Sequence, residues 1–105
     1  MDLSLRQVRA FLAVARFGSF TRAAATLHLS QPALTVQIRK LEDALKIRLL
    51  DRNSRSVELT SIGRELLPLL QRTMQDVDAI VADTHAKSAG RLGMVRIASL
   101  PSFAA

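Results

Sequence analysis

Three short amphipathic segments follow one another almost without connectors, and the residues that start and end them constrain the fold more than any other feature. The segments cover residues 4–18, 19–28 and 30–45. Each opens with a serine, whose hydroxyl can accept a hydrogen bond from a free N–H of the first helical turn. Gly18 can end the first segment because glycine adopts a positive φ without steric cost. We therefore expect three helices joined by tight turns.

The third segment has one apolar and one polar side. The residues at helical spacing that predict its buried side are Leu34, Ile38, Leu41 and Leu45. In a helix-turn-helix, the second helix lies in the major groove of DNA and reads base edges, while the first helix braces it. On an arbitrary helix the same polar side chains would be an ordinary solvated face. The residues of this segment that we expect to contact DNA are Ser30, Gln31, Pro32, Ala33, Thr35, Val36, Arg39 and Lys40.

Two short β-capable runs, residues 47–50 and 56–59, predict a two-stranded hairpin after the third helix. Such a hairpin fits the wing of a winged helix-turn-helix, where Arg52 and Arg55 would lie beside phosphates or in the minor groove. Arg52 could instead pair with an acidic neighbour and hold the wing in place. Arg22, in the second helix, is expected either to touch a phosphate or to be solvated.

Helical periodicity returns at Thr60 and persists to about Ser88. A helix of about 29 residues spans ~43 Å at 1.5 Å per residue, which is more than the preceding residues can cover. Much of its apolar stripe is therefore expected to associate with another molecule. The expected dimerisation residues are Ile62, Leu66, Leu69, Leu70, Met74, Val77, Ile80 and Val81.

The predicted fold is mainly α, a winged helix-turn-helix (three helices plus a two-stranded wing) followed by a long linker helix. The helix-turn-helix occupies residues 1–59 and the linker helix residues 60–89. Residues 90–105 contain a flexible connector and one β-capable run, which has no partner strand and so predicts the beginning of a further domain that this chain lacks.

The net charge of +6 is carried entirely by the first 64 residues. Residues 1–64 hold eleven basic and five acidic side chains, whereas residues 65–105 hold four of each. Twelve of the fifteen cations are arginine, whose planar fork suits phosphate and base edges. This bias favours a polyanionic partner, usually nucleic acid.

The residues that enzymes and metal sites need are scarce. The chain has no cysteine and only two histidines, His28 and His85, so no catalytic residue, no metal ligand and no cofactor is expected. Glu42 and Asp43 lie next to each other near a lysine, so we expect a surface ion pair with a cation rather than acid/base catalysis. No apolar run approaches 18 residues and no secretory signal is visible, so we expect a cytoplasmic protein with no membrane partner.

The stretches GSFTRAAATLHLSQPALT (18–35), IRKLE (38–42) and RSVELTSIG (55–63) closely resemble, in order and spacing, the N-terminal region of LysR-type transcriptional regulators. The resemblance covers residues 3 to about 88. It implies a winged helix-turn-helix, a linker helix that pairs antiparallel with a partner's copy, and binding to an interrupted palindromic promoter site. It also implies that the chain's last residues begin an effector-binding domain, through which a small-molecule inducer would act.

Three positions depart from the pattern of that family, and one of them is Leu50, which replaces a frequent phenylalanine at the start of the wing. Val36 stands where many relatives carry arginine or another polar residue, and it can touch a thymine methyl but cannot donate to guanine. Lys46 stands where a helix-ending glycine is common, and a left-handed conformation there would cost about 1–2 kcal/mol.

These observations together predict sequence-specific binding to double-stranded DNA by a homodimer or a higher oligomer built from it. The alternative is a truncated interaction protein that heterodimerises with full-length regulators and blocks them. That alternative would not require good base readout, with which Val36 is compatible.

Overall fold

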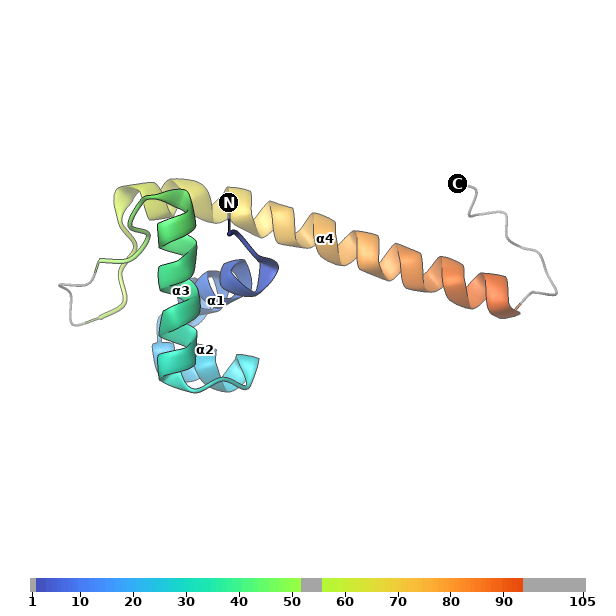
Figure 1. Cartoon of the computed structure of the whole chain (residues 1–105), viewed down its shortest axis with the longest axis horizontal. Helices are drawn as coiled ribbons and strands as arrows, with labels where there is room; N and C mark the ends of the chain where they lie inside the picture. The colour runs from blue at the N-terminus through green and yellow to red at the C-terminus, as the bar shows by residue number, and fades with distance from the viewer. Residues whose placement is uncertain (1, 52–55, 94–105) are drawn as a thin grey trace. The chain divides into compact units, whose positions relative to one another are not determined.

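The computed structural model describes residues 2–51 and 56–93 of the chain, and within these ranges it contains four helices (Figure 1). They are α1 (Leu5–Phe17), α2 (Phe20–Leu27), α3 (Gln31–Leu45) and α4 (Ser61–Gly93). The predicted succession of three short helices and one long helix is confirmed. Residues 90–93, which the sequence predicts as part of a connector, are helical, because an isolated glycine lowers helix stability by only about 1 kcal/mol.

Serine side chains cap the three short helices, as the sequence predicts. Ser4 and Gln7 form a reciprocal capping box at α1, with N···O distances of 3.3 and 3.2 Å. The hydroxyl oxygen of Ser19 accepts a hydrogen bond from the third residue of α2 at 3.1 Å, and that of Ser30 accepts one from the third residue of α3 at 3.2 Å. The beginnings of these helices are thus fixed by local contacts.

Left-handed residues end the same three helices. Gly18 has a φ of 62°, and His28 and Lys46 each have a φ of 60°. The backbone N–H of Leu29 donates to the carbonyl of Ala24 at 2.9 Å, which closes the end of α2. Since His28 and Lys46 carry a Cβ, each left-handed conformation costs about 1–2 kcal/mol, as expected for Lys46.

The helices α1, α2 and α3 pack against one another around one apolar core (Figure 1). Ala23 and Ala24 of α2 are buried, and their small side chains allow close approach of the neighbouring helices. The largest fully buried side chains are Phe11, Val14, Leu34, Ile38, Leu41 and Leu49. Three of these six belong to α3, so the core fixes which side of that helix faces inward.

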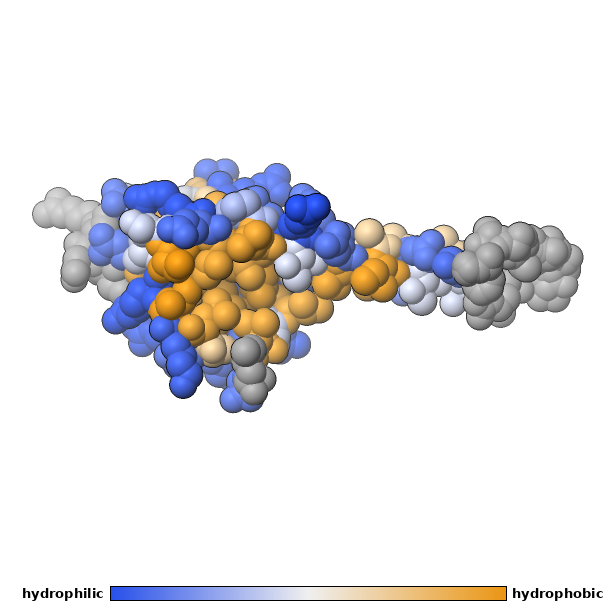
Figure 2. Space-filling view, turned by 90° about the horizontal axis from the view of Figure 1, so that it is seen from above, coloured by the Kyte–Doolittle hydropathy of each residue, from blue (hydrophilic) through white to orange (hydrophobic). Residues whose placement is uncertain are grey.

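Part of the apolar surface stays uncovered. The chain divides after Met74 into two compact units, so α4 contributes residues 61–74 to the first unit and its remainder to the second. Figure 2 shows apolar side chains gathered on one face of the first unit. The large apolar residues of this unit that are more than a third exposed are Leu3, Leu5, Val36, Ile62 and Leu69.

The segment between α3 and α4 pairs at a single point. Leu50 and Leu59 form an antiparallel bridge, and the N–H of Asp51 donates to the carbonyl of Glu58 at 2.9 Å. The described residues therefore contain one bridge instead of two regular strands. The N–H groups of Leu49 and Leu50 donate to the carboxylate of Glu42 in α3. Arg52 and Arg55 of the predicted wing lie outside the described residues.

No helix in the described ranges has the length and apolarity that crossing a lipid bilayer requires.

The start of α4 lies against the backbone of the segment that follows α3. The hydroxyl of Thr60 donates to the carbonyl of Arg48 at 2.6 Å and accepts from the N–H of Gly63 at 3.0 Å. A Cβ placed on Gly63 would overlap the carbonyl oxygen of Leu49. Glycine is therefore required at this position by close approach of two backbones.

We predict that Gly63→Ala lowers the free energy of unfolding by about 1–3 kcal/mol, because the added methyl forces α4 away from the Leu49 carbonyl. Urea unfolding measures this change. Ser61→Ala, at an exposed position in the same turn, is the control and should stay within about 0.5 kcal/mol of the wild type. Equal effects of the two substitutions would contradict the packing argument.

Candidate nucleic-acid interface

Helix α3 presents a polar face to solvent opposite its buried side. Leu34, Ile38 and Leu41 are fully buried. Ser30, Gln31, Pro32, Val36, Arg39 and Lys40 are exposed, whereas Ala33 and Thr35 are half-buried. Buried and exposed positions recur with the 3.6-residue period of the helix. The residues predicted to contact DNA therefore lie together along one helix. Their contact with DNA remains a prediction.

The helices α2 and α3 are tied together at the start of the polar face. The side-chain Nε2 of Gln31, the first residue of α3, donates to the hydroxyl oxygen of Thr21 in α2 at 2.9 Å. The sequence argument identified Gln31 but missed Thr21. Ten residues separate the two, and no local pattern indicates their contact.

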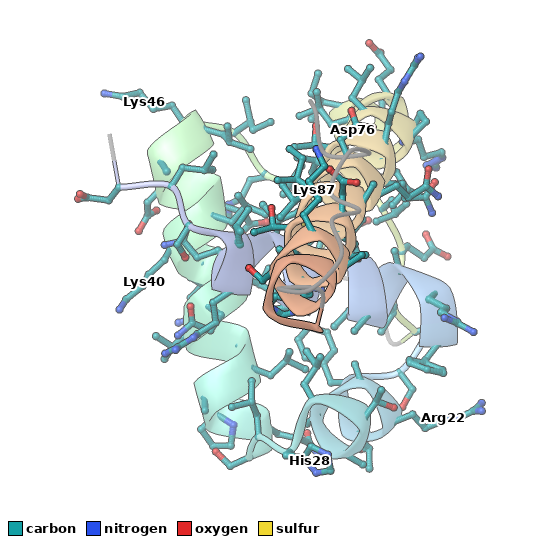
Figure 3. All side chains as sticks on the ribbon, turned by 90° about the vertical axis from the view of Figure 1, so that its right-hand side faces the viewer. Arg22, His28, Lys40, Lys46, Asp76 and Lys87 are labelled. Carbon is teal, nitrogen blue, oxygen red and sulfur yellow. The ribbon has the colours of Figure 1, made fainter. Side chains whose placement is uncertain are left out.

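Two arginines share one aromatic ring at the junction of α1 and α2. The guanidinium carbons of Arg16 and Arg22 each lie 5.4 Å from the centre of the Phe17 ring, within the range of cation–π attraction. Figure 3 shows Arg22 extending outward from α2. Arg22 was predicted from the sequence as a candidate DNA contact, whereas Arg16 was not. Arg16 is adjacent to Phe17 in the sequence, which could have indicated its contact with the ring.

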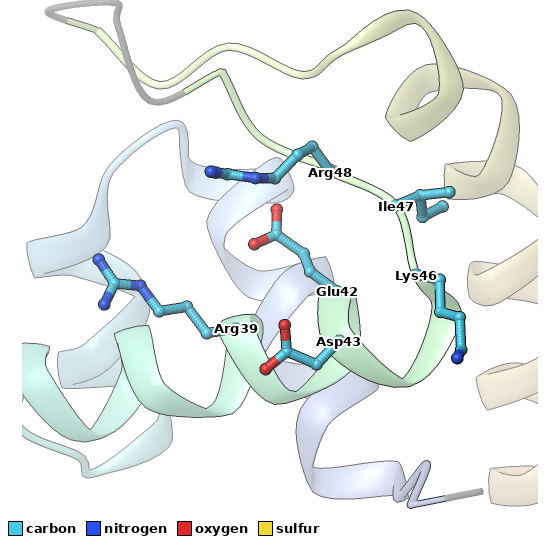
Figure 4. Close-up of a pocket in the computed structure, with 6 residues that line it drawn as sticks. All are labelled: Arg39, Glu42, Asp43, Lys46, Ile47 and Arg48. Atoms are coloured by element: carbon cyan, nitrogen blue, oxygen red, sulfur yellow. The ribbon is translucent and has the colours of Figure 1, made fainter.

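The basic residues Arg39 and Lys40 of α3 lie in different surroundings. Arg39 lines an open depression of about 810 Å³ together with Arg48 from the following segment (Figure 4). Lys40 instead lines a second depression together with Asp2 and Gln7 of the N-terminal segment. In Figure 3, Lys40 and Arg22 extend to opposite sides of the view. Of the two basic residues of α3, Arg39 is therefore the one that lies beside the wing segment, the chain between α3 and α4 (residues 46–60).

Glu42 is a buried structural residue and not a surface one. Its side chain is only 5% exposed, and its Oε2 accepts hydrogen bonds from the N–H groups of Leu49 at 2.8 Å and Leu50 at 3.2 Å. The predicted surface position is therefore wrong for Glu42. The carboxylate anchors the start of the wing segment to α3, whereas Asp43 is exposed.

The predicted dimerisation residues of α4 differ in how much surface they leave free. Leu69, Ile80 and Val81 are 59%, 65% and 45% exposed, and Ile62 is 37% exposed. Leu66, Leu70 and Val77 are half-buried. Met74 is only 4% exposed and so offers little free surface, and its role in association remains a prediction.

Comparison with known proteins places the geometry in a family context. Residues 5–64 match the model of the bacterial regulatory helix-turn-helix proteins of the lysR family. The RuBisCO operon transcriptional regulator of Allochromatium vinosum is 38% identical over 107 residues, covering 99% of this chain and 35% of that protein. The regulator ClcR of Pseudomonas putida is 38% identical over 96 residues, covering 91% of this chain and 33% of that protein. The chain thus spans about a third of the length of these relatives.

Solved structures of DNA complexes have the same fold. The BenM DNA-binding domain in complex with catB site 1 DNA gives a TM-score of 0.78 at 39% identity, covering 84% of this chain and 99% of that chain. Vibrio fischeri DarR in complex with DNA gives a TM-score of 0.79 at 28% identity, covering 85% of this chain and 30% of that chain.

We predict that Glu42→Ala lowers the free energy of unfolding by about 2–6 kcal/mol, because two buried N–H groups lose their acceptor at about 1–3 kcal/mol each. Urea unfolding of the two variants measures the difference. The neighbouring Asp43→Ala is the matched control and should change the value by no more than about 0.5 kcal/mol. A stability loss as large in Asp43→Ala as in Glu42→Ala would refute the anchoring role.

Proposed function

We propose that this chain, which belongs to the lysR family of bacterial regulatory helix-turn-helix proteins, binds specific sites in double-stranded DNA as a homodimer and so controls transcription. The observation that carries the proposal is the polar face of α3, where Gln31 and Arg39 are exposed while the opposite side of the helix is fully buried. A helix held in this way can enter the major groove without unfolding any part of the core. Its role is binding, with no catalytic step and no cofactor.

Phosphate contacts supply affinity and orientation, whereas base contacts supply sequence specificity. The excess of cations in residues 1–64 supplies most of the affinity by displacing counterions from the duplex. Arg22 at the α1–α2 junction is a candidate phosphate contact that orients the domain. Gln31, Thr35 and Val36 then read base edges, with Val36 contacting a thymine methyl. Arg52 and Arg55 would add contacts beside the recognition helix.

The second half of the proposal is association through the linker helix, residues 60–89. Exposed apolar side chains at Leu69, Ile80 and Val81 support it, because a helix pair would remove them from water. Two reading heads on one face of the duplex would contact half-sites about 10–10.5 base pairs apart, arranged as an interrupted palindrome. A higher oligomer would be built from this dimer.

The cytoplasm is the compartment in which such a protein meets its DNA. The residues that follow α4 would begin an effector-binding domain, and a small-molecule inducer would act through that domain.

We predict that binding to a duplex selected from a random pool weakens steeply with salt, with a slope of roughly −0.9 in log K against log [salt] per phosphate neutralised. Arg39→Ala should reduce that slope by about 0.9 if it contacts a phosphate. Arg72→Ala, an exposed arginine of α4, is the control and should leave the slope unchanged. Fluorescence anisotropy from low to physiological salt measures all three. A flat profile for the wild type would contradict the electrostatic part of the proposal, and sequence-indifferent retention would favour the blocking heterodimer instead.

We predict that Ile80→Glu converts the dimer to monomer, because association would bury a charged carboxylate in an apolar contact. Sedimentation velocity measures the change, and operator affinity should fall with it. Ala82→Glu adds the same charge about 200° around the helix and should leave the dimer intact. An intact Ile80→Glu dimer would exclude this stripe as the interface.

A further inference from the structure

One contact between α2 and α3 lies on the surface rather than in the core. The Nε2 of Gln31 and the hydroxyl oxygen of Thr21 are 2.9 Å apart, and both side chains are exposed. The backbone at both ends of the contact is held, because Ser19 caps α2 two residues before Thr21 and Ser30 caps α3 directly before Gln31. The direction of the Gln31 side chain is therefore defined by two fixed helices rather than by solvent.

The hydrogen-bonding groups that this contact leaves free on Gln31 match the major-groove edge of adenine. The amide of Gln31 has two N–H donors and one acceptor oxygen, and Thr21 engages one N–H. One N–H and Oε1 remain, which is the pair of groups that glutamine uses for bidentate contact with N7 and N6 of adenine. Guanine offers two acceptors in the major groove and cannot satisfy Oε1.

The hydroxyl of Thr21 is used differently from that of Thr26 in the same helix. Thr26 donates its hydroxyl proton to the carbonyl of Arg22 at 2.9 Å, within its own helix. Thr21 instead accepts from Gln31, so its own hydroxyl proton can still be donated, for example to a phosphate oxygen. The Thr21 hydroxyl can thus donate to the DNA backbone while its oxygen accepts from the Gln31 amide, which faces the bases in this proposal.

We propose that Thr21 is a specificity-determining positioning residue, whose hydroxyl holds the Gln31 amide in the orientation that selects adenine. This inference rests on the proposed function. Holding the side chain before binding removes rotamer freedom that would otherwise be lost on the DNA, and it disfavours the rotated amide that would suit other bases. Thr21 acts on base preference through Gln31, so its effect on preference is confined to the base pair that Gln31 reads.

The test uses the whole 105-residue chain and duplexes selected from a random pool by the wild type. Each base pair of a half-site is replaced in turn, and the dissociation constants are measured by fluorescence anisotropy at fixed salt. The position read by Gln31 is the one where Gln31→Ala abolishes the wild-type preference. At that position we expect the wild type to prefer adenine by ~10-fold or more.

Thr21→Val keeps the shape of threonine and removes the hydroxyl. It should reduce the adenine preference at that one position by about 3- to 10-fold and leave the preferences at other positions within about 2-fold. Thr21→Ser restores the hydroxyl and should restore the preference. Thr26→Val, on the same helix, is the matched control and should have no effect. Adding Thr21→Val to Gln31→Ala should cause no further loss of preference at that position.

Several outcomes would overturn the inference. One is an unchanged adenine preference in Thr21→Val, another is a uniform loss at every position, and a third is a preference in Thr21→Ser as weak as in Thr21→Val. Circular dichroism checks that the variants fold, and Thr21→Ala provides a second variant without the hydroxyl. A wild-type chain with no sequence preference would refute the proposed function itself. Selective DNA binding with an unaltered Thr21→Val would refute only the role of Thr21.

Discussion

The side of α3 that is buried decides what the rest of the molecule can do. Leu34, Ile38 and Leu41 are fully buried, as is Phe11 of α1, the helix against which α3 packs. Burial of each large apolar side chain contributes roughly 1.5–3 kcal/mol to the free energy of folding. Rotating α3 about its axis would expose several of these side chains and lose their contributions together. The polar face is consequently held at a fixed orientation by a core that contains none of its residues. Apart from Ser30, which caps α3, the residues proposed to contact DNA lie outside the buried side that holds the helix in place.

Polar contacts connect the wing segment to that same core. The Glu42 carboxylate binds two N–H groups directly after α3, and Thr60 binds the carbonyl of Arg48 just before α4 begins. Close backbone contact at Gly63 completes the arrangement. Because these contacts all involve residues 48–50, one short segment connects the end of α3 with the first turn of α4. An error in that segment would disturb both helix ends.

The sequence was most informative where the determinants are local. Serine caps, Gly18 and the 3.6-residue periodicity predicted α1, α2 and α3, because each of these signals lies within the helix that it defines. The burial of Glu42 was not predictable, since its partners lie seven and eight residues away and their approach depends on the tertiary fold. The burial of Met74 and the contact of Thr21 with Gln31 have the same cause. In each case the sequence pattern predicts the side of the helix on which the residue lies, or its charge. It does not predict which residue the tertiary fold places beside it.

We propose that the exposed face of α3 contacts a DNA duplex while the buried face does not move. The most direct measurement is nuclear magnetic resonance of the isotope-labelled chain, titrated with a selected duplex. The largest shifts of backbone and side-chain amide signals should fall in residues 30–40 and near Arg22, with methyl signals of Leu34 and Ile38 little changed. Shifts confined to α1 and to residues 75–88, with α3 unaffected, would show that the duplex binds elsewhere.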